Sequence, residues 1–292
     1  MKILVTGVTG QLGSEVATEF KRFGHEVIAT DRQSLDFLQP AQAAAVIRLE
    51  QPDWVINCAA YTQVDRAESE PEQAFIINRD TPAQLAQAVA AYGGRLLQLS
   101  TDFVFDGTQT RPYVEDDATN PLGVYGRSKL EGEQAVQREL PGAVIVRTAW
   151  VYGVHGHNFV KTMLRLATAG SPLRVVSDQR GTPTWTSDIV AAIVALVDQQ
   201  ASGVFHFTAS GETSWHGFAS AILEEAASAG FTIKTGKVEP IATTEYPTPA
   251  TRPAYSVLNT NKISACLPFT IPAWRDSLKN MLQEYATCAD CS

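Results

Sequence analysis

Residues 1–13 read M-K-I-L-V-T-G-V-T-G-Q-L-G, an apolar run followed at once by three glycines spaced three residues apart. Glycines in such a loop allow a tight turn, close approach of the backbone to a pyrophosphate, and close packing of a helix on a sheet. The N-terminus of the helix that follows then faces the anion. The spacing alone is a weak signal, but its place between a first strand and a first helix predicts a dinucleotide-binding βαβ unit carried by Gly7, Gly10 and Gly13.

Short β-rich runs alternate with segments of helical pattern through the first half of the chain. This alternation predicts a parallel sheet with helices on both faces. Glycines and prolines mark the ends of the helical segments. We expect strands at residues 3–6, 26–30, 54–58, 96–100 and 144–148 and helices at 11–23, 41–50, 82–91 and 121–140, the last with Asn120 as its N-cap and Pro121 in its first turn.

After Trp150 the rhythm is less regular. We expect helices at 159–169 and 190–197 and strands at 173–176 and 204–208, while the proline-rich remainder resembles a smaller irregular lobe. The predicted fold class is α/β, a doubly wound parallel sheet (Rossmann fold) with a smaller mixed C-terminal substrate lobe. Residues 1–149 are assigned to a dinucleotide-binding domain to which 187–210 return, and 150–186 with 211–292 to the substrate-binding lobe.

The overall charge argues against two classes of partner. The 292 residues include 23 basic and 31 acidic side chains, a net charge of −8, without a cluster of Lys or Arg. Nucleic acid and anionic membranes are therefore not expected as partners. The first apolar run is too short for a signal peptide, and no later run approaches the ~20 residues of a membrane span. The expected compartment is the cytoplasm.

Candidate metal-binding residues are sparse. Cys288 and Cys291 form a C-x-x-C near the end of the chain without a second pair, which is more typical of a frayed tail than of a metal or redox site. His155 and His157 have no third ligand nearby and are interpreted as loop histidines. No bound metal is predicted.

Asp31 and Arg32 follow the second expected strand. In a dinucleotide-binding unit an acidic side chain at this place accepts a hydrogen bond from the adenosine ribose. Arg32 beside it is suited to hold a 2′-phosphate. The cofactor is therefore predicted to be NADPH or NADH, with the choice between them open.

Three residues form a candidate proton-transfer set. Tyr125 and Lys129 are four apart in Y-G-R-S-K and share one face of the expected helix, and Thr101 lies at the end of the fourth expected strand. Thr101 can donate to a substrate carbonyl, and Tyr125 can protonate the same oxygen while a hydride arrives from the nicotinamide. Lys129 stabilises the phenolate that remains.

The chain resembles the extended short-chain dehydrogenase/reductase superfamily and, within it, the dTDP-4-dehydrorhamnose reductase family. The resemblance spans nearly the whole chain. It implies reduction of the 4-keto group of dTDP-4-dehydro-L-rhamnose by NADPH or NADH, with the product used for lipopolysaccharide or cell-wall polysaccharide. It is carried by G-V-T-G-Q-L-G at 7–13, N-C-A-A-Y-T at 57–62, V-D-R-A-E at 64–68, S-T-D-F-V-F-D-G at 100–107, Y-G-R-S-K at 125–129, R-T-A-W-V-Y-G at 147–153, N-F-V-K-T-M-L at 158–164, D-Q-R-G-T-P-T at 178–184 and P-T-P-A-T-R-P at 247–253.

The resemblance also implies roles for individual residues. The catalytic set is Thr101, Tyr125 and Lys129, and Lys129 also bonds the nicotinamide ribose. The cofactor is held by Gly7, Gly10, Gln11, Leu12, Gly13, Asp31, Arg32, Ala59, Ala60, Tyr61, Tyr125 and Lys129. The substrate is held by Thr101, Asp102, Phe103, Trp150, Asn158, Gln179 and Arg252, of which Arg252 is the candidate phosphate fork and otherwise a surface salt bridge.

The chain departs from the family pattern at a few positions. Residue 103 is Phe where the family often has Tyr, and residue 255 is Tyr where Asn is common, so the details of the sugar pocket stay open. Some relatives dimerise through magnesium held by glutamates. Glu15 matches one of them, but the last residues offer no matching glutamate, and the expected assembly is a monomer or a homodimer without such a metal.

Other activities of the same superfamily remain as alternatives. Related dehydratases carry T-D-E at the strand end, and here Phe103 replaces the glutamate, which argues against elimination. Another nucleotide-sugar 4-ketoreductase or an epimerase is compatible with the catalytic set. The regulatory subunit of methionine adenosyltransferase, a binding partner without this chemistry, also resembles the family.

Overall fold

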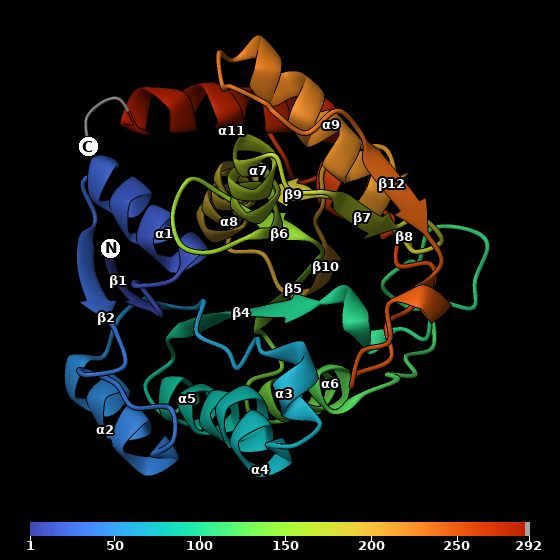
Figure 1. Cartoon of the computed structure of the whole chain (residues 1–292). Coiled ribbons are helices and arrows are strands. Elements are labelled where there is room, and N and C mark those ends of the chain that lie inside the picture. The colour runs from blue at the N-terminus through green and yellow to red at the C-terminus, as the bar shows by residue number, and fades with distance from the viewer. Residues whose placement is uncertain (290–292) are drawn as a thin grey trace.

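The computed structural model describes residues 1–289, with side chains through residue 287. At its centre, within the described residues, is a six-stranded sheet in the order β10-β5-β4-β3-β1-β2 (Figure 1). Every neighbouring pair of strands is parallel, which confirms the predicted fold class. The strands are β1 (Lys2–Thr6), β2 (Glu26–Thr30), β3 (Trp54–Asn57), β4 (Arg95–Thr101), β5 (Val144–Thr148) and β10 (Gly203–His206).

Helices cover both faces of this sheet. Side chains alternate along β1, so that Ile3 and Val5 enter one core and Leu4 enters the other. The first core packs against α1 (Gln11–Arg22) and α8 (Thr186–Asp198). The second packs against α2 (Pro40–Glu50), α5 (Thr81–Ala90) and α6 (Val124–Glu139), which lie together on the other side of the sheet in Figure 1.

The segment between β3 and α5 holds short helices that the sequence pattern did not predict. They are α3 (Val64–Ala67), α4 (Pro71–Phe75) and a π-helical turn, η1 (Ile76–Asp80). Each is one turn or little more, too short to show a helical period in sequence. Together they pack on α6 and form one side of the site described below.

The predicted start of α6 is wrong by three residues. The helix begins at Val124, after Gly123 as its N-cap, instead of at Pro121. Glu68, which follows α3, accepts a hydrogen bond from the Val124 backbone N–H over 2.8 Å. Asn120 instead donates its side-chain amide to Asp106 over 3.1 Å. The cap comes from a distant segment, so local sequence could not place it.

The C-terminal part of the chain is more regular than expected, because it includes two long helices, α9 (Trp215–Ser228) and α11 (Trp274–Ala289). Phe218 and Ile222 of α9 and Leu278 and Leu282 of α11 are buried in a third core. The other elements of this part are β6 (Val151–Tyr152), α7 (Phe159–Ala169), β7 (Leu173–Val176), β8 (Arg180–Gly181), β9 (Thr184–Trp185), β11 (Thr213–Ser214), β12 (Val238–Ile241), η3 (Thr243–Glu245) and α10 (Asn261–Ser264).

The expected frayed tail with Cys288 and Cys291 lies at the end of the described residues and partly outside them. The backbone of Cys288 belongs to α11, whereas Cys291 lies outside the described residues. Among the helices of residues 1–289, none is both long and apolar enough to cross a membrane.

Gly132 gives a test of how closely α6 packs on η1. A Cβ added at Gly132 would overlap the carbonyl oxygen of Asn78, a backbone atom that cannot move aside cheaply. We expect Gly132→Ala to destabilise the fold by about 1–3 kcal/mol. Thermal unfolding should show a lower Tm for this variant. Gly142→Ala, where the added Cβ meets nothing within 4 Å, is the control, and equal Tm values for the two variants would contradict the packing described.

Candidate active site

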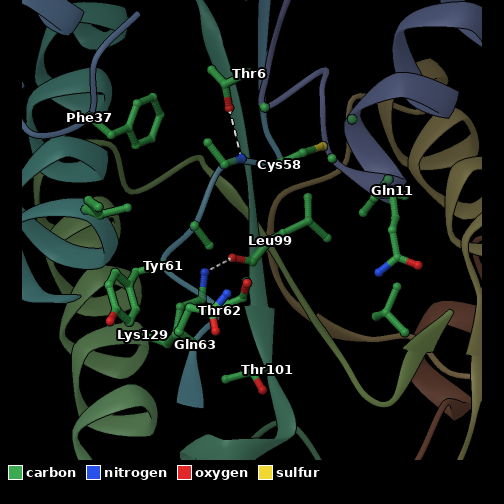
Figure 2. A pocket seen from close by; sticks show the side chains of 18 of the residues that line it. Thr6, Gln11, Phe37, Cys58, Tyr61, Thr62, Gln63, Leu99, Thr101 and Lys129 are labelled. Atoms are coloured by element: carbon green, nitrogen blue, oxygen red, sulfur yellow. Dashed lines mark hydrogen bonds between the residues drawn. The ribbon is translucent and has the colours of Figure 1, made fainter. Parts of the chain in front are cut away.

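A pocket of about 910 Å³ lies at the carboxyl edge of the sheet. Its walls come from the glycine loop after β1, from residues after β2, β3, β4 and β5, and from α6. Figure 2 shows side chains from these separate segments around one cavity. In doubly wound sheets ligands bind at this edge, so the pocket is the candidate site for both cofactor and substrate.

The glycine loop has the geometry of a phosphate-binding turn. Gly7 adopts a φ of +69°, a conformation that other residues reach with strain. A Cβ at Gly13 would overlap the Gly7 carbonyl oxygen, so only glycine allows α1 to approach the loop this closely. Gly10 caps α1 without a side chain and leaves the first helical N–H groups facing the pocket. These groups fit an anionic pyrophosphate.

Asp31 and Arg32 both line the pocket at the end of β2. Asp31 Oδ1 accepts from the backbone N–H groups of Gln33 and Ser34 over 3.0 and 2.9 Å. These bonds, chiefly those to Ser34, lower the pKa of Asp31, so it is a carboxylate that can accept from a ribose hydroxyl. Arg32 is exposed beside it, where it can reach a 2′-phosphate.

The wall after β3 is fixed by side-chain hydrogen bonds. The Thr6 hydroxyl accepts from the Ala59 backbone N–H over 3.1 Å, one of the dashed lines in Figure 2. Tyr61 is 9% exposed and donates its hydroxyl to Glu70 over 2.5 Å. Ala59, Ala60 and Tyr61 all line the pocket. The predicted nicotinamide side of the site therefore lies against the same cavity as the glycine loop.

Tyr125, Lys129 and Thr101 all line the pocket, with the Thr101 hydroxyl beside the phenol of Tyr125. Burial raises the pKa of Tyr125 to about 12, although the Thr101 hydroxyl beside it acts to lower it. Burial lowers the pKa of Lys129 to about 8, and the carboxylate of Glu133 opposes this shift. At neutral pH the phenol is thus protonated and the amine charged, as a proton donor and its electrostatic partner require.

The hydrogen bond of Lys129 goes to a backbone group. Its Nζ donates to the carbonyl oxygen of Leu99 on β4 over 2.6 Å, as Figure 2 shows. Sequence spacing placed the ammonium next to Tyr125 on the helix face but gave no sign of this second anchor. The bond ties the face of α6 that carries Tyr125 and Lys129 to the strand that carries Thr101.

Asp102 and Phe103 follow Thr101 in a short 3-10 turn, η2 (Asp102–Val104), and line the pocket. The Thr101 hydroxyl donates to Asp102 over 3.1 Å and accepts from the Phe103 backbone N–H over 3.2 Å. Asp102 is 2% exposed, and burial raises its pKa to about 6. The ring of Phe103 meets that of Tyr125 edge-on at 5.5 Å.

Trp150 lines the pocket from the side of the C-terminal lobe. Its φ is +47°, a left-handed conformation that costs a non-glycine residue of order 1 kcal/mol or more. The indole stacks on Trp215 with ring centroids 3.7 Å apart. One face of the indole is thus covered by Trp215, and this stacking holds the side chain at the pocket wall.

Three predicted substrate residues do not line the pocket in this structure, and each has a partner within the protein. Asn158 caps α7 and also donates to Gln11 over 2.9 Å. Gln179 is buried and donates to Thr243. Arg252 forms a two-pronged salt bridge with Asp65, with Nη2 2.8 Å from Oδ2 and Nη1 3.0 Å from Oδ1. Thus the geometry observed is that of the alternative, in which Arg252 forms a salt bridge, and its partner is Asp65 on α3.

Several pocket residues were not predicted from the sequence. Leu35 and Phe37 line the pocket beyond β2, and Cys58 lies between β3 and the alanines. Burial raises the pKa of the Cys58 thiol to about 12, so it is an apolar wall group. Cys58 sits inside the recognised motif at 57–62 and could have been found there, whereas Leu35 and Phe37 carry no local signal.

Glu15 has a carboxylate neighbour that the sequence reasoning overlooked. Burial raises its pKa to about 7, and the negative charge of Glu284 on α11 adds to the rise. Glu284 therefore lies close enough to act on Glu15 electrostatically, while the expectation that the chain offers no matching glutamate for a metal between two copies stays a prediction. Thr186 donates to Glu15 over 2.6 Å. Among the described residues, no cluster of three or more His, Cys, Asp or Glu is arranged to hold a metal.

The parallel sheet, the glycine loop and the Tyr125–Lys129 pair in one pocket define a nicotinamide-dependent oxidoreductase of the short-chain dehydrogenase/reductase class. The chain belongs to the family described as RmlD substrate binding domain, whose model matches residues 1–287. This confirms the resemblance stated from sequence.

Individual relatives match over nearly their whole length. The chain is 41% identical over 296 residues to the dTDP-4-dehydrorhamnose reductase of Salmonella typhimurium, covering 98% of this chain and 99% of that protein. It is 39% identical over 289 residues to the spore coat polysaccharide biosynthesis protein SpsK of Bacillus subtilis, covering 99% of both. The crystal structure of dTDP-4-dehydrorhamnose reductase from Bacillus anthracis in complex with NADP superposes with a TM-score of 0.92 at 35% identity, over 97% of this chain and 99% of that one.

The position of Arg32 predicts its effect on cofactor choice. Arg32→Ala should raise KM for NADPH at least ~10-fold, because a charge-assisted bond to the 2′-phosphate is lost, while KM for NADH changes less than ~2-fold. Steady-state kinetics with each cofactor give both values. Arg48→Ala, an exposed arginine outside the pocket, is the control. Equal losses with NADH and NADPH would remove Arg32 from phosphate recognition.

Proposed function

We propose that this protein reduces the 4-keto group of dTDP-4-dehydro-L-rhamnose to give dTDP-L-rhamnose, with NADPH or NADH as cofactor. The observation that carries the proposal is the convergence of Thr101, Tyr125 and Lys129 with the glycine loop on a single pocket. Membership in the family supports it. The named reductase from Salmonella typhimurium and the NADP complex from Bacillus anthracis point to the same substrate and cofactor.

The residues divide the reaction between them. When bound, the dihydronicotinamide supplies the hydride that reaches C4 of the sugar. Thr101, whose hydroxyl donates to Asp102 in this structure, would turn the same proton to the carbonyl oxygen and so stabilise negative charge as it develops there. Tyr125 gives its phenolic proton to that oxygen and completes the alcohol. Lys129 stabilises the resulting phenolate with its charge, held in place by Leu99.

The proposed binding roles follow the same geometry. Gly7, Gly10, Gln11, Leu12 and Gly13 hold the cofactor pyrophosphate, with Asp31 and Arg32 at the adenosine ribose and Ala59, Ala60 and Tyr61 beside the nicotinamide. Asp102, Phe103 and Trp150 border the sugar. Asn158, Gln179 and Arg252 would contact the nucleotide diphosphate only after leaving their present partners.

Two alternative activities are weaker on this structure. A dehydratase needs an acid at residue 103, and the Phe103 ring that packs on Tyr125 has none. A purely regulatory binding subunit does not need a buried phenol and ammonium in the same pocket as the glycine loop. A 4-epimerase shares these residues, but it returns the hydride and would not consume the cofactor.

The biological setting is part of the same proposal. We place the reaction in the cytoplasm, in a protein that acts as a monomer or homodimer and has no nucleic-acid partner, in keeping with its net charge of −8. The product would serve the synthesis of a surface polysaccharide. The relationship to a spore coat polysaccharide protein supports that assignment.

The proposed function is tested by absorbance at 340 nm with dTDP-4-dehydro-L-rhamnose and NADPH. We expect one NADPH to be consumed for each dTDP-L-rhamnose formed, with product identity fixed by mass and NMR. A panel of other nucleotide-linked 4-keto sugars establishes specificity. Tight retention of dinucleotide without turnover on any of them would contradict a reductase.

Tyr125→Phe tests the proton donor. The variant keeps the ring but cannot supply a proton, so kcat should fall at least ~10²-fold while the NADPH dissociation constant changes little. Tyr246→Phe, at an exposed tyrosine, is the matched control. Near-normal turnover by the Tyr125 variant would show that another group donates the proton.

The charge of Lys129 predicts an alkaline limit to activity. Lys129 must carry a proton to stabilise the phenolate, and its pKa is lowered to about 8, so kcat should fall as pH rises through about 8. Tyr125 keeps its proton over this range because its pKa is about 12. Lys129→Arg, whose charge persists, should lose the alkaline limb. A wild-type profile that stays flat to about pH 10 would contradict this assignment.

A further inference from the structure

Two side-chain bonds join α6 to β4, one helical turn apart. Lys129 Nζ donates to the Leu99 carbonyl oxygen over 2.6 Å. Four residues further along the same face of α6, Glu133 accepts a hydrogen bond from the Ser100 hydroxyl. Leu99 and Ser100 are successive residues of β4, and the next residue is the catalytic Thr101. The helix with the proton donor is thus pinned to the strand with the carbonyl-binding hydroxyl at two adjacent points.

A third element completes this junction. Arg147 on β5 lies directly opposite Ser100 in the sheet register. Its Nη2 is 2.7 Å from Glu133 Oε2, and its Nε is 3.0 Å from Oε1. The side chains of Arg147 and Glu133 are only 6% and 2% exposed. Glu133 therefore receives hydrogen bonds from two strands at once.

Stability alone does not explain a buried ion pair at this position. Removing two charges from water offsets most of their mutual attraction, and apolar residues of similar volume often pack as well or better. A charged, fully bonded carboxylate in this place, however, fixes direction and distance in a way that apolar packing does not. It also places a negative charge one turn from Lys129.

We propose that Glu133, held by Ser100 and Arg147, is a positioning residue for the reduction, which sets α6 against the end of β4 and keeps Lys129 charged. Tyr125 and Lys129 then face Thr101 at a fixed separation. This inference rests on the proposed reductase function and adds residues that do not themselves line the pocket, apart from Ser100.

The effect of Glu133 on the charge of Lys129 follows from the groups around the amine. Burial lowers the pKa of Lys129, and Glu133 is the first group that opposes the shift. Without the carboxylate charge, the ammonium would lose its proton at lower pH. Cys58 after β3 acts on Lys129 in the same direction as Glu133. Tyr125 on α6 and Asp102 after β4 line the same pocket, and Arg147 on β5 is paired with Glu133.

Glu133→Gln tests the proposal, because glutamine keeps the shape and an acceptor but removes the charge. We expect kcat to fall at least ~10-fold with KM for the nucleotide sugar within ~2-fold. The alkaline limb of the pH profile should move down by about 1 pH unit. Glu131→Gln is the matched control: the same change on the same helix, at a partly exposed residue whose carboxylate is 3.0 Å from Arg79.

Two further variants separate positioning from folding. Ser100→Ala removes one link to Glu133 without leaving a charge unpaired, and should lower kcat while leaving the pH profile in place. The double change Glu133→Met with Arg147→Met replaces the pair by apolar groups and should retain or raise Tm. We expect this folded variant to show the same loss of kcat and a smaller downward pH shift, because the positive charge of Arg147 is removed together with Glu133.

Wild-type kcat and an unshifted alkaline limb in the folded double variant would overturn the proposal. Failure of the wild-type protein to oxidise NADPH with any 4-keto sugar nucleotide would instead refute the proposed function. In that case NADPH affinity measured against pH still decides the charge question. Identical pH dependence of NADPH binding in the wild type and in Glu133→Gln would show that Glu133 does not control Lys129.

Discussion

The active edge of the sheet depends on a buried chain of hydrogen bonds that crosses three strands. Thr6 on β1 donates to Asn57 on β3 over 2.6 Å, and Asn57 donates to Gln98 on β4 over 2.6 Å. Gln98 then donates to the Leu99 carbonyl oxygen, the same atom that receives Lys129. A slip of one strand would leave several buried polar groups unpaired at about 1–3 kcal/mol each, so the parallel register is fixed. The glycine loop and the catalytic end of β4 therefore meet at one edge.

This edge sets the acid–base chemistry through burial. Removal from water raises the pKa of Tyr125 and lowers that of Lys129, and both changes favour the uncharged forms. A buried phenol on its own would be a reluctant acid. In the proposed reaction the charged amine of Lys129, four residues along the helix, offsets the cost of the phenolate, and the charge of Glu133 opposes the lowering of the Lys129 pKa. The proposed proton transfer from Tyr125 would therefore be coupled to the charge state of Lys129.

The elements predicted correctly are determined by local sequence patterns. The features that the sequence did not predict depend on contacts between residues far apart in the chain. The strands and the glycine loop are set by neighbouring residues, and strands 26–30 and 144–148 were placed at their observed bounds. The start of α6 was misplaced because Glu68, far away in sequence, caps it. The apolar residues of α9 and α11 are buried because the two helices pack against each other, which the local sequence does not indicate. The prolines between the two helices led to the prediction of irregular structure. The partner of Arg252 could not be chosen among many acids until α3 was placed beside it.

That last pairing bears on how the substrate enters. Arg252 belongs to the C-terminal part, and Asp65 lies on α3 between Val64 and Arg66, which line the pocket, so their salt bridge joins the C-terminal part to one wall of the site. The side chains are 25% and 40% exposed, and a pair this open to water contributes on the order of 1 kcal/mol or less. A diphosphate presents more negative charge and the same two-pronged geometry to a guanidinium. Exchange of Asp65 for phosphate would thus cost little. The observed salt bridge and the role in phosphate binding expected from sequence are compatible as two states of the same side chain.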